Sequence, residues 1–398
     1  MIVSLLGYLY AAALAVLAFP LALGAQPKIA PKADIDLHTH AEWRVDVPVE
    51  FDTAGRLLFL FRDKFRLNPK GNWHLIRLTG PFSDEVSREE IDFSIPQEPA
   101  DPESARRWDA FSSRLLLSPD GSHAYAIFQG AVVKAKPGPP PPGAVRNVSV
   151  ESFSSLISFD LREFRVLDSA GVNEHSKDLV GEQISATGDL LLLYLTDTDW
   201  AIAIRDRFLH EVKTLTVSAI PVERAGRYSC QLRPDLHVEC PTRAGGEIVL
   251  GPKSALQLAE STCKMIGSGA FGIGKDETIK SYVIQADRLC TRDESSNEEL
   301  VSTDLLPPCR QGWRVSAISP DRHSVLTSCI LMDTFLDTFS YISKASLQLI
   351  DVRTLVARTT IPLSTRHRST FAVFHQSGTS TVAVIEDGAK LLLYTVAD

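Results

Sequence analysis

Short apolar runs separated by turn-forming residues dominate the chain from residue 41 to residue 398. The runs at 190–195 and 381–385 are typical: they are rich in leucine, β-branched or aromatic residues and are flanked by Gly, Asp, Thr or Ser. This pattern indicates strands, and segments with the apolar spacing of a helix are few. We therefore predict an all-β fold.

One five-residue turn recurs along the chain. It consists of an apolar residue, a mostly polar residue, two turn formers and often Gly, and its clearest copy is Leu117 to Gly121. Copies begin at positions 51, 117, 184, 232, 273, 318 and 374, and the copy at 273 is the weakest. Pro presets φ, Asp caps its own turn and Gly accepts a positive φ, so each copy can reverse the chain between two strands.

A second, Asp-led turn often follows the first. It is clear at Asp160 and Asp351, and Asp206 and Asp287 belong to looser copies. Two hairpins per unit imply about four strands, which is one blade of a β-propeller. We predict about seven blades over residues 35–398.

Blade repeats usually span roughly 40 to 50 residues, so the wider spacings between the first copies require insertions. The Pro-rich run at 136–143 is one insertion, because such a run cannot form a central strand. The polar region at 101–107 is a second candidate.

The Ser-Pro-Asp-Gly turn at 118–121, the Ser-Pro-Asp-Arg turn at 319–322 and the hairpin at 349–361 resemble the bacterial, secreted WD40-like propellers of the TolB and YVTN type. The resemblance implies a ring of four-stranded blades around a central channel. Members of this superfamily bind proteins, bind ligands or catalyse reactions according to their loops, so the resemblance implies no single activity.

Ring closure is expected to join the two ends of the domain. Only about two strands, Thr381 to Ile385 and Lys390 to Val396, follow the last copy of the turn. An incomplete blade would expose strand edges. We therefore expect the segment Ile35 to Val49 to pair with the sheet that contains Leu391 to Val396.

Residues 1–25 contain no charged side chain, and the small residues Ala22, Gly24 and Ala25 fit the cleavage region of a signal peptide. The alternative is a retained membrane anchor, because the apolar stretch is long enough to cross a bilayer. Residues 26–34 would then be a linker. Both interpretations predict a secreted or periplasmic domain whose one possible membrane contact is the anchor.

Cysteine usage agrees with export. The six cysteines are Cys230, Cys240, Cys263, Cys290, Cys309 and Cys329. An even number in an exported chain predicts disulfides, although six cysteines allow 15 pairings. Cys230 and Cys240 flank the turn signal Arg233 to Asp235, so a bond across that hairpin is the one pairing that the sequence favours locally.

The most suggestive chemical motif contains His38 and His40. An H-x-H pair on a strand presents two imidazoles on one face, and Asp36 to His40 resembles the first metal motif of the PHP phosphoesterases and is close to that of the amidohydrolases. Those families need further ligands, and the other histidines form no second cluster along the sequence. We expect an exposed strand face here and no metal.

Other motifs lack their context. Gly267 to Gly272 matches G-x-G-x-x-G, but its flanks indicate strands and no kinase motif follows, so no cofactor is expected. Four tryptophans are expected to pack within or between blades: Trp73, Trp108, Trp200 and Trp313. With 41 basic and 49 acidic residues, the net charge of -8 excludes a general nucleic-acid binder.

These observations favour an exported binding module for a protein or peptide. The alternative is a propeller-type hydrolase or lyase with its active site at the mouth of the channel. Convergent His, Asp or Glu side chains around the channel would favour the enzyme, whereas an apolar mouth would favour binding.

Overall fold

The computed structural model describes residues 29–37, 48–62, 73–80, 86–96, 108–135, 148–172, 178–219, 222, 223, 226, 230–241, 247–252, 255–257, 263, 270–273, 276–285, 288–294, 296, 298–302, 306, 307, 309, 312–335 and 339–397. The apolar start at 1–25, His38, His40 and the Pro-rich run at 136–143 lie outside these ranges.

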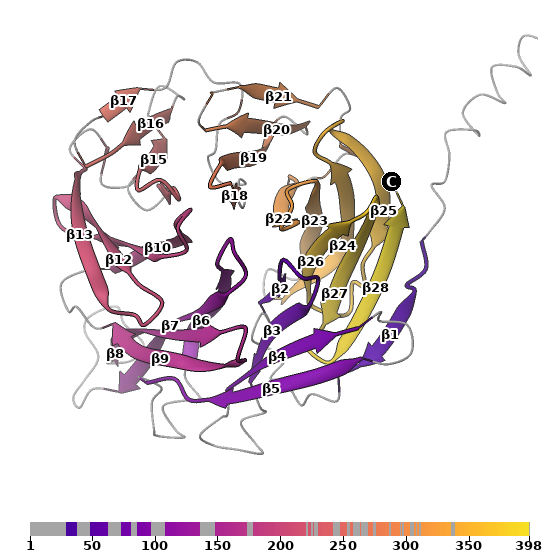
Figure 1. Ribbon diagram of the computed structural model, residues 1–398, viewed down its shortest axis with the longest axis horizontal. Helices are drawn as coiled ribbons and strands as arrows, with labels where there is room; N and C mark the ends of the chain where they lie inside the picture. Colours follow the sequence, from indigo (N-terminus) through magenta and orange to yellow (C-terminus); the bar gives the residue numbers. More distant parts are fainter. Residues whose placement is uncertain are drawn as a thin grey trace, which may run out of the picture.

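Seven four-stranded antiparallel sheets form a closed ring (Figure 1), which confirms the all-β, seven-bladed propeller. Six blades each use four consecutive strands, and the first strand is the innermost. Blades 1 to 3 contain β2 (Val49–Phe51), β3 (Leu57–Arg62), β4 (Trp73–Thr79) and β5 (Ser87–Phe93); β6 (Trp108–Leu117), β7 (His123–Ala135), β8 (Val148–Asp160) and β9 (Arg165–Val172); and β10 (Asp178–Ile184), β11 (Leu190–Leu195), β12 (Asp199–Arg205) and β13 (Glu211–Ser218). Blades 4 to 6 contain β14 (Gln231–Leu232), β15 (Val238–Pro241), β16 (Glu247–Leu250) and β17 (Ala255–Gln257); β18 (Ala270–Ile273), β19 (Ile279–Gln285), β20 (Arg288–Asp293) and β21 (Glu299–Val301); and β22 (Arg314–Ile318), β23 (Ser324–Phe335), β24 (Phe339–Asp351) and β25 (Val356–Pro362).

The seventh blade is built from both ends of the domain. β26 (Ser369–Gln376), β27 (Thr379–Glu386) and β28 (Lys390–Ala397) supply three strands, and β1 (Ala33–Asp36) pairs antiparallel with β28 as the outermost strand. Closure by the two ends is therefore confirmed. The closing strand begins at Ala33, inside the segment expected to be a linker, and Val49 belongs to blade 1 instead, because it pairs with Phe59 on β3.

All seven copies of the repeated turn connect the innermost strand of a blade to the second strand. The Asp-led turns at Asp160, Asp206 and Asp351 connect the third strand to the fourth, as predicted. The looser copy expected at Asp287 lies outside the described residues.

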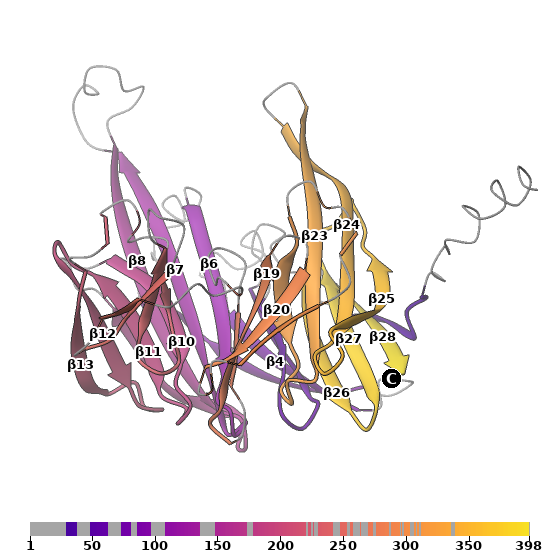
Figure 2. The same cartoon turned by 90° about the horizontal axis from the view of Figure 1, so that it is seen from above.

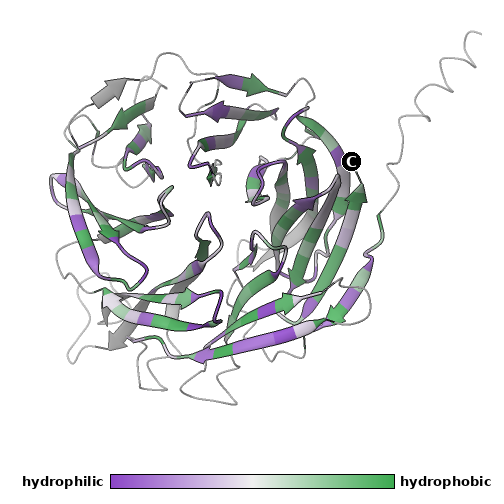
Figure 3. Cartoon of the chain, viewed as in Figure 1, coloured by the Kyte–Doolittle hydropathy of each residue, from purple (hydrophilic) through white to green (hydrophobic). Residues whose placement is uncertain are grey.

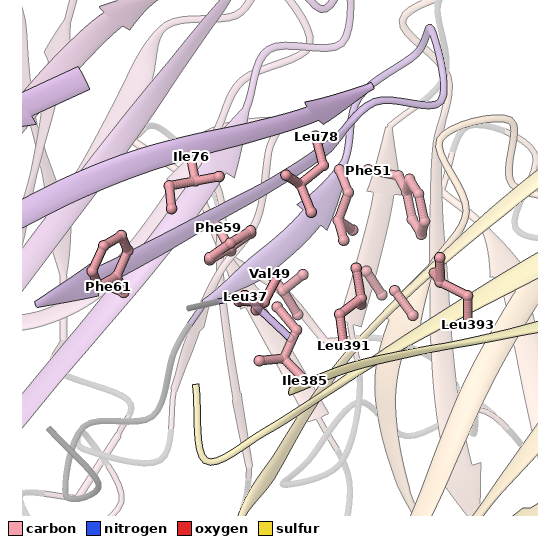
Figure 4. Packing of buried hydrophobic residues seen from close by; sticks show 13 residues of the cluster. Leu37, Val49, Phe51, Phe59, Phe61, Ile76, Leu78, Ile385, Leu391 and Leu393 are labelled. Carbon is pink, nitrogen blue, oxygen red and sulfur yellow. The ribbon is translucent and has the colours of Figure 1, made fainter. Parts of the chain in front are cut away.

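Apolar side chains pack between neighbouring blades. At the seam between blades 1 and 7, Leu37, Val49 and Phe51 lie against Leu391 and Leu393 (Figure 4). Trp73, Trp200 and Trp313 are buried in such clusters, as expected; the side chain of Trp108 lies outside the description. The outer strands β5 and β13 are mostly exposed and carry more hydrophilic residues (Figure 3).

Each of blades 4, 5 and 6 contains one disulfide. Cys230–Cys240 crosses the β14–β15 hairpin, the local pairing that the sequence favoured, and the other two bonds are Cys263–Cys290 and Cys309–Cys329. The bonds join cysteines 10, 27 and 20 residues apart. Loop closure of this size stabilises a fold by about 3 kcal/mol per bond. Among the described residues, Cys263 and Cys290 pack with Val283 and Phe271 in blade 5.

A buried ionic network joins blades 4 and 5. Arg233 and Arg292 each contact both Glu239 and Glu294, at distances from 2.7 to 3.3 Å. The four side chains are at most 6% exposed. Arg233 also pairs with the partly exposed Asp235 at 2.9 Å, so three carboxylates face two guanidinium groups. Their mutual attraction offsets the desolvation penalty of the buried ions.

The ring has two distinct faces. One carries the seven repeated turns and the Asp-led turns, and we call it the turn face. From the opposite face two strand pairs, β7–β8 and β23–β24, project beyond the other blades (Figure 2). We call these two pairs the ribbons and their side of the ring the ribbon face. Within the described ranges, no helix has the length and apolar character needed to cross a membrane.

Candidate functional site in the central channel

A cavity of about 260 Å³ lies in the channel, between the innermost strands of five blades. These strands are β2, β6, β10, β18 and β22, and the cavity is also lined by turn residues such as Ser118, Pro119, Ser319 and Pro320. The repeated turns lie at the turn face, so this cavity lies at that end of the channel. The closed ring brings together five segments that are far apart in the sequence.

The wall of the cavity is largely apolar or built from small residues. Two of its charged residues are engaged in turns. Asp52 accepts hydrogen bonds from the backbone N–H groups of Ala54 and Arg56 and pairs with the Arg56 guanidinium at 2.6 Å. Arg322 donates to Thr278 and contacts Asp276 at 3.2 Å, so its charge is directed toward blade 5.

Glu50 is the exception on the cavity wall. Its neighbours on β2, Val49 and Phe51, are buried in the seam between blades, and because side chains alternate along a strand Glu50 points the other way. The Glu50 side chain is partly exposed to the cavity. Desolvation inside the channel raises its pKa to about 8, with no compensating charge from the described residues. At neutral pH this carboxyl is mainly protonated, and it can therefore donate a hydrogen bond inside the channel.

The sequence carried a signal for Glu50 that the motif search missed. In the other six copies of the repeated turn, the residue directly before the apolar position is Leu116, Gln183, Gln231, Gly272, Ala317 or Val373. Glu50 is the charged residue in this set. A comparison of the seven copies position by position would have identified it.

The residues singled out from the sequence do not assemble into one site. His38 and His40 lie outside the described ranges, and Gly272 lines the cavity from β18, where Tyr282 packs close to it. The match to a glycine-rich phosphate loop is therefore partly a strand of blade 5.

Two groups of side chains among the described residues are close enough to hold a metal ion. In blade 1, His74 Nδ1 lies 2.8 Å from Glu90 and 2.7 Å from Asp92, and its ring stacks on Phe61. The other group contains Asp321, His323 and His375 and spans blades 6 and 7. The sequence search missed this second group because blade packing, not sequence spacing, brings the two histidines together.

Comparisons with known proteins show similarity in structure alone. No family model and no curated protein matches the sequence. Among solved structures, a chain of a mitotic checkpoint complex is similar with a TM-score of 0.48 and 11% identity, over 94% of this chain and 98% of that one. The β-propeller domain of Cps50 (Swd1) from Myceliophteria thermophila is similar with a TM-score of 0.49 and 8% identity, over 92% of this chain and 100% of that domain.

Proposed function

We propose that this chain is an exported binding module that recognises a protein or peptide. The observation that carries the proposal is the presence of two long ribbons on the same face of the ring (Figure 2). The strands of the ribbons have 12 or 13 residues, whereas β11 and β12 of blade 3 have 6 and 7. Each ribbon extends past the point where the flanking strands of its own blade stop pairing with it.

The pairing along the ribbons supports recognition of an extended peptide segment. β6 pairs with β7 up to Val132, and β9 pairs with β8 from Ser154. In blade 6, β22 pairs with β23 up to Ser328, and β25 pairs with β24 from Ser346. Past these points, apart from the hydrogen bond from Leu363 N–H to Ala345 O, no described strand pairs with the outer edges of the ribbons. Adding a strand to such an edge is a usual way in which a sheet binds a peptide.

The cavity supports binding more than catalysis. Its described lining consists mostly of apolar or small residues but exposes polar and apolar surface in similar amounts, and its charged residues other than Glu50 are engaged in turns. Convergent ionisable side chains, which would favour the enzyme, are not gathered on this wall. The protein therefore resembles a scaffold that presents loops and strand edges.

Export is part of the proposal and is supported by two independent features. The first 25 residues are apolar and uncharged, and the six cysteines form three disulfides, which persist in oxidising compartments. N-terminal sequencing of the protein from the cell envelope or medium is expected to begin near Ala25 or Gln26. An intact Met1 in cytosolic protein would contradict export.

The binding proposal is tested by site-specific photo-crosslinking in cells. A photoreactive amino acid is placed at Lys134 or Thr334 in the ribbons, and at Arg162 or Arg353 in turns of the same two blades on the turn face. We expect protein crosslinks from the ribbon positions and few from the turn positions. Equal crosslinking from both faces would overturn the assignment of the ribbon face.

A second variant removes the projecting parts of the ribbons while keeping the ring. Residues 133–150 are replaced by Asn-Gly between the paired residues Val132 and Glu151, and residues 332–343 by Asn-Gly between Leu331 and Lys344. We expect Tm to stay within a few degrees of wild type, while the partner identified by crosslinking no longer co-purifies with the variant. Retention of the partner by this variant would contradict the proposal.

Glu50 favours a second candidate function, a hydrolase or lyase that uses the channel. A carboxyl that is protonated at neutral pH can act as a general acid. In that case Glu50→Gln would abolish turnover and leave ribbon crosslinking unchanged. The binding proposal predicts that Glu50→Gln changes neither partner capture nor its specificity.

A further inference from the structure

Two histidines from neighbouring blades face the same carboxylate oxygen at the turn face. Asp321 and His323 lie in the turn between β22 and β23, and His375 lies near the end of β26. The Nδ1 atoms of His323 and His375 are 2.9 and 2.6 Å from Oδ2 of Asp321, and the centroids of the two imidazole rings are 5.1 Å apart.

The other oxygen of this carboxylate is held in place. Ser319 Oγ donates a hydrogen bond of 2.6 Å to Oδ1 of Asp321, and the backbone N–H of His323 donates a second of 3.1 Å. These two donors fix the carboxylate so that its Oδ2 is directed toward both imidazoles. Outer hydrogen bonds of this kind orient the ligands in metal sites.

We propose that Asp321, His323 and His375 bind a divalent transition-metal ion, and that zinc is the ion they suit best. Two imidazole nitrogens and one carboxylate oxygen are a ligand set that zinc accepts, and the fourth position would be taken by water or by a ligand from a partner.

The geometry needs only a small adjustment. At the usual zinc–ligand distances of about 2.0 to 2.2 Å, ligand atoms in a tetrahedron lie about 3.3 Å apart. Oδ2 and the Nδ1 atoms must therefore separate by about half an ångström from their present positions. The side chain of His375 is 9% exposed and fixes one ligand, whereas His323 is 44% exposed and can adjust while the ion enters from solvent.

The surroundings favour this group over the second one in blade 1. Arg322, which is adjacent in sequence, contacts Asp276 and Thr278 and so directs its charge away from Asp321. The group around His74 offers one imidazole and two carboxylates, a set that contains more oxygen and suits zinc less well. The proposed ion would join blade 6 to blade 7, the blade that closes the ring.

Zinc binding is measured on the full folded chain, without an affinity tag and after treatment with EDTA. Isothermal titration with zinc chloride at pH 7.5 is expected to give one ion per chain at micromolar or lower Kd. Saturation should raise Tm by about 3–5 °C, because a ligand that binds the folded state alone stabilises it. We expect His375→Gln to weaken binding at least tenfold.

His367→Gln is the matched control. His367 also directs Nδ1 toward a carboxylate, that of Asp387, and it lies close to β26 in blade 7, but it belongs to neither group of metal-ligating side chains. This variant should bind zinc as wild type does. Should His375→Gln fail to fold, as circular dichroism would show, the more exposed His323→Gln provides the same test. Absence of zinc binding by wild type, or equal binding by the folded His375 or His323 variant, would overturn the proposal.

Discussion

The imidazole of His123 in blade 2 lies 2.9 Å, through Nε2, from the carbonyl oxygen of Gly188 in the repeated turn of blade 3. Tyr125 donates to the same carbonyl oxygen at 3.2 Å. Gly188 has φ of +92°, and a Cβ atom added there would lie 3.1 Å from His123 Cε1. The glycine of the turn therefore serves two purposes: it permits the positive φ, and it allows the next blade to approach.

Alanine substitutions at Gly188 and at Gly312, compared with each other, should separate the effect of backbone strain from that of the contact between blades. Gly188→Ala is expected to reduce the free energy of unfolding by about 2–3 kcal/mol, because it adds both backbone strain and a crowded contact with His123. Gly312 is the matched control, since it has φ of +79° and no atom of the described residues lies within 4 Å of the added Cβ. Gly312→Ala should cost about 1 kcal/mol, the strain alone. Equal losses in urea unfolding would show that the contact between blades has no energetic effect.

The closing strand is tested at Ile35, which pairs with Leu391 on β28 and packs on the seam between blades 1 and 7. Ile35→Asp places a charge against this apolar cluster and should reduce the free energy of unfolding by about 2–4 kcal/mol. Thermal unfolding should remain a single transition at lower Tm. Asp34→Asn, which removes the exposed contact with Lys390, is the control and should unfold near the wild-type Tm. A wild-type Tm for Ile35→Asp would contradict closure by β1.

Substitution of a single residue in the ionic network between blades 4 and 5 should reduce the free energy of unfolding. Glu239→Gln leaves the charges of Arg233 and Arg292 undercompensated in a buried site and is expected to cost about 3–5 kcal/mol in urea unfolding. Glu163→Gln removes the partner of Arg165 in an exposed pair on blade 2 and should leave the urea midpoint unchanged. Similar midpoints for the two variants would indicate that water reaches Glu239.

The carboxyl of Glu50 should make stability depend on pH. Its pKa is about 8 in the folded chain and near 4.5 when unfolded, so between these values the folded state binds more protons than the unfolded state. The free energy of unfolding should therefore fall as pH rises from about 5 to 8, at up to about 1.4 kcal/mol per pH unit from this group.

Glu50→Gln should remove this contribution, so the difference between wild type and variant is the quantity to follow. The variant should become progressively more stable than wild type as the pH approaches 8. Parallel stability curves for the two proteins from pH 5 to 8 would show that Glu50 titrates normally.

Local chemistry explains which parts of the fold were predictable from sequence. A turn such as Ser118 to Gly121 is specified by its own residues, so all seven copies could be identified and the blade number followed. The pairing of Cys230 with Cys240 was predictable for the same reason, since a short hairpin fixes it. The other two disulfides depend on how segments outside the hairpins return to their blades.

Contacts between blades were beyond the sequence because no local signal specifies them. Glu239 and Arg292 are 53 positions apart, and His375 and Asp321 are 54 apart, yet each pair is in contact. Glu50 was overlooked since a single acidic residue in an apolar run becomes informative only when the repeats are aligned.

The pairing of β1 with β28 also determines when the molecule can become complete during its synthesis. Among the described strands, β1 is synthesised first and its partner β28 last, so the ring cannot close until translation has passed β28. A chain that stops before Lys390 has no partner for β1 and presents open strand edges to cellular quality control. Only a chain that includes β28 can therefore cover both of these strand edges.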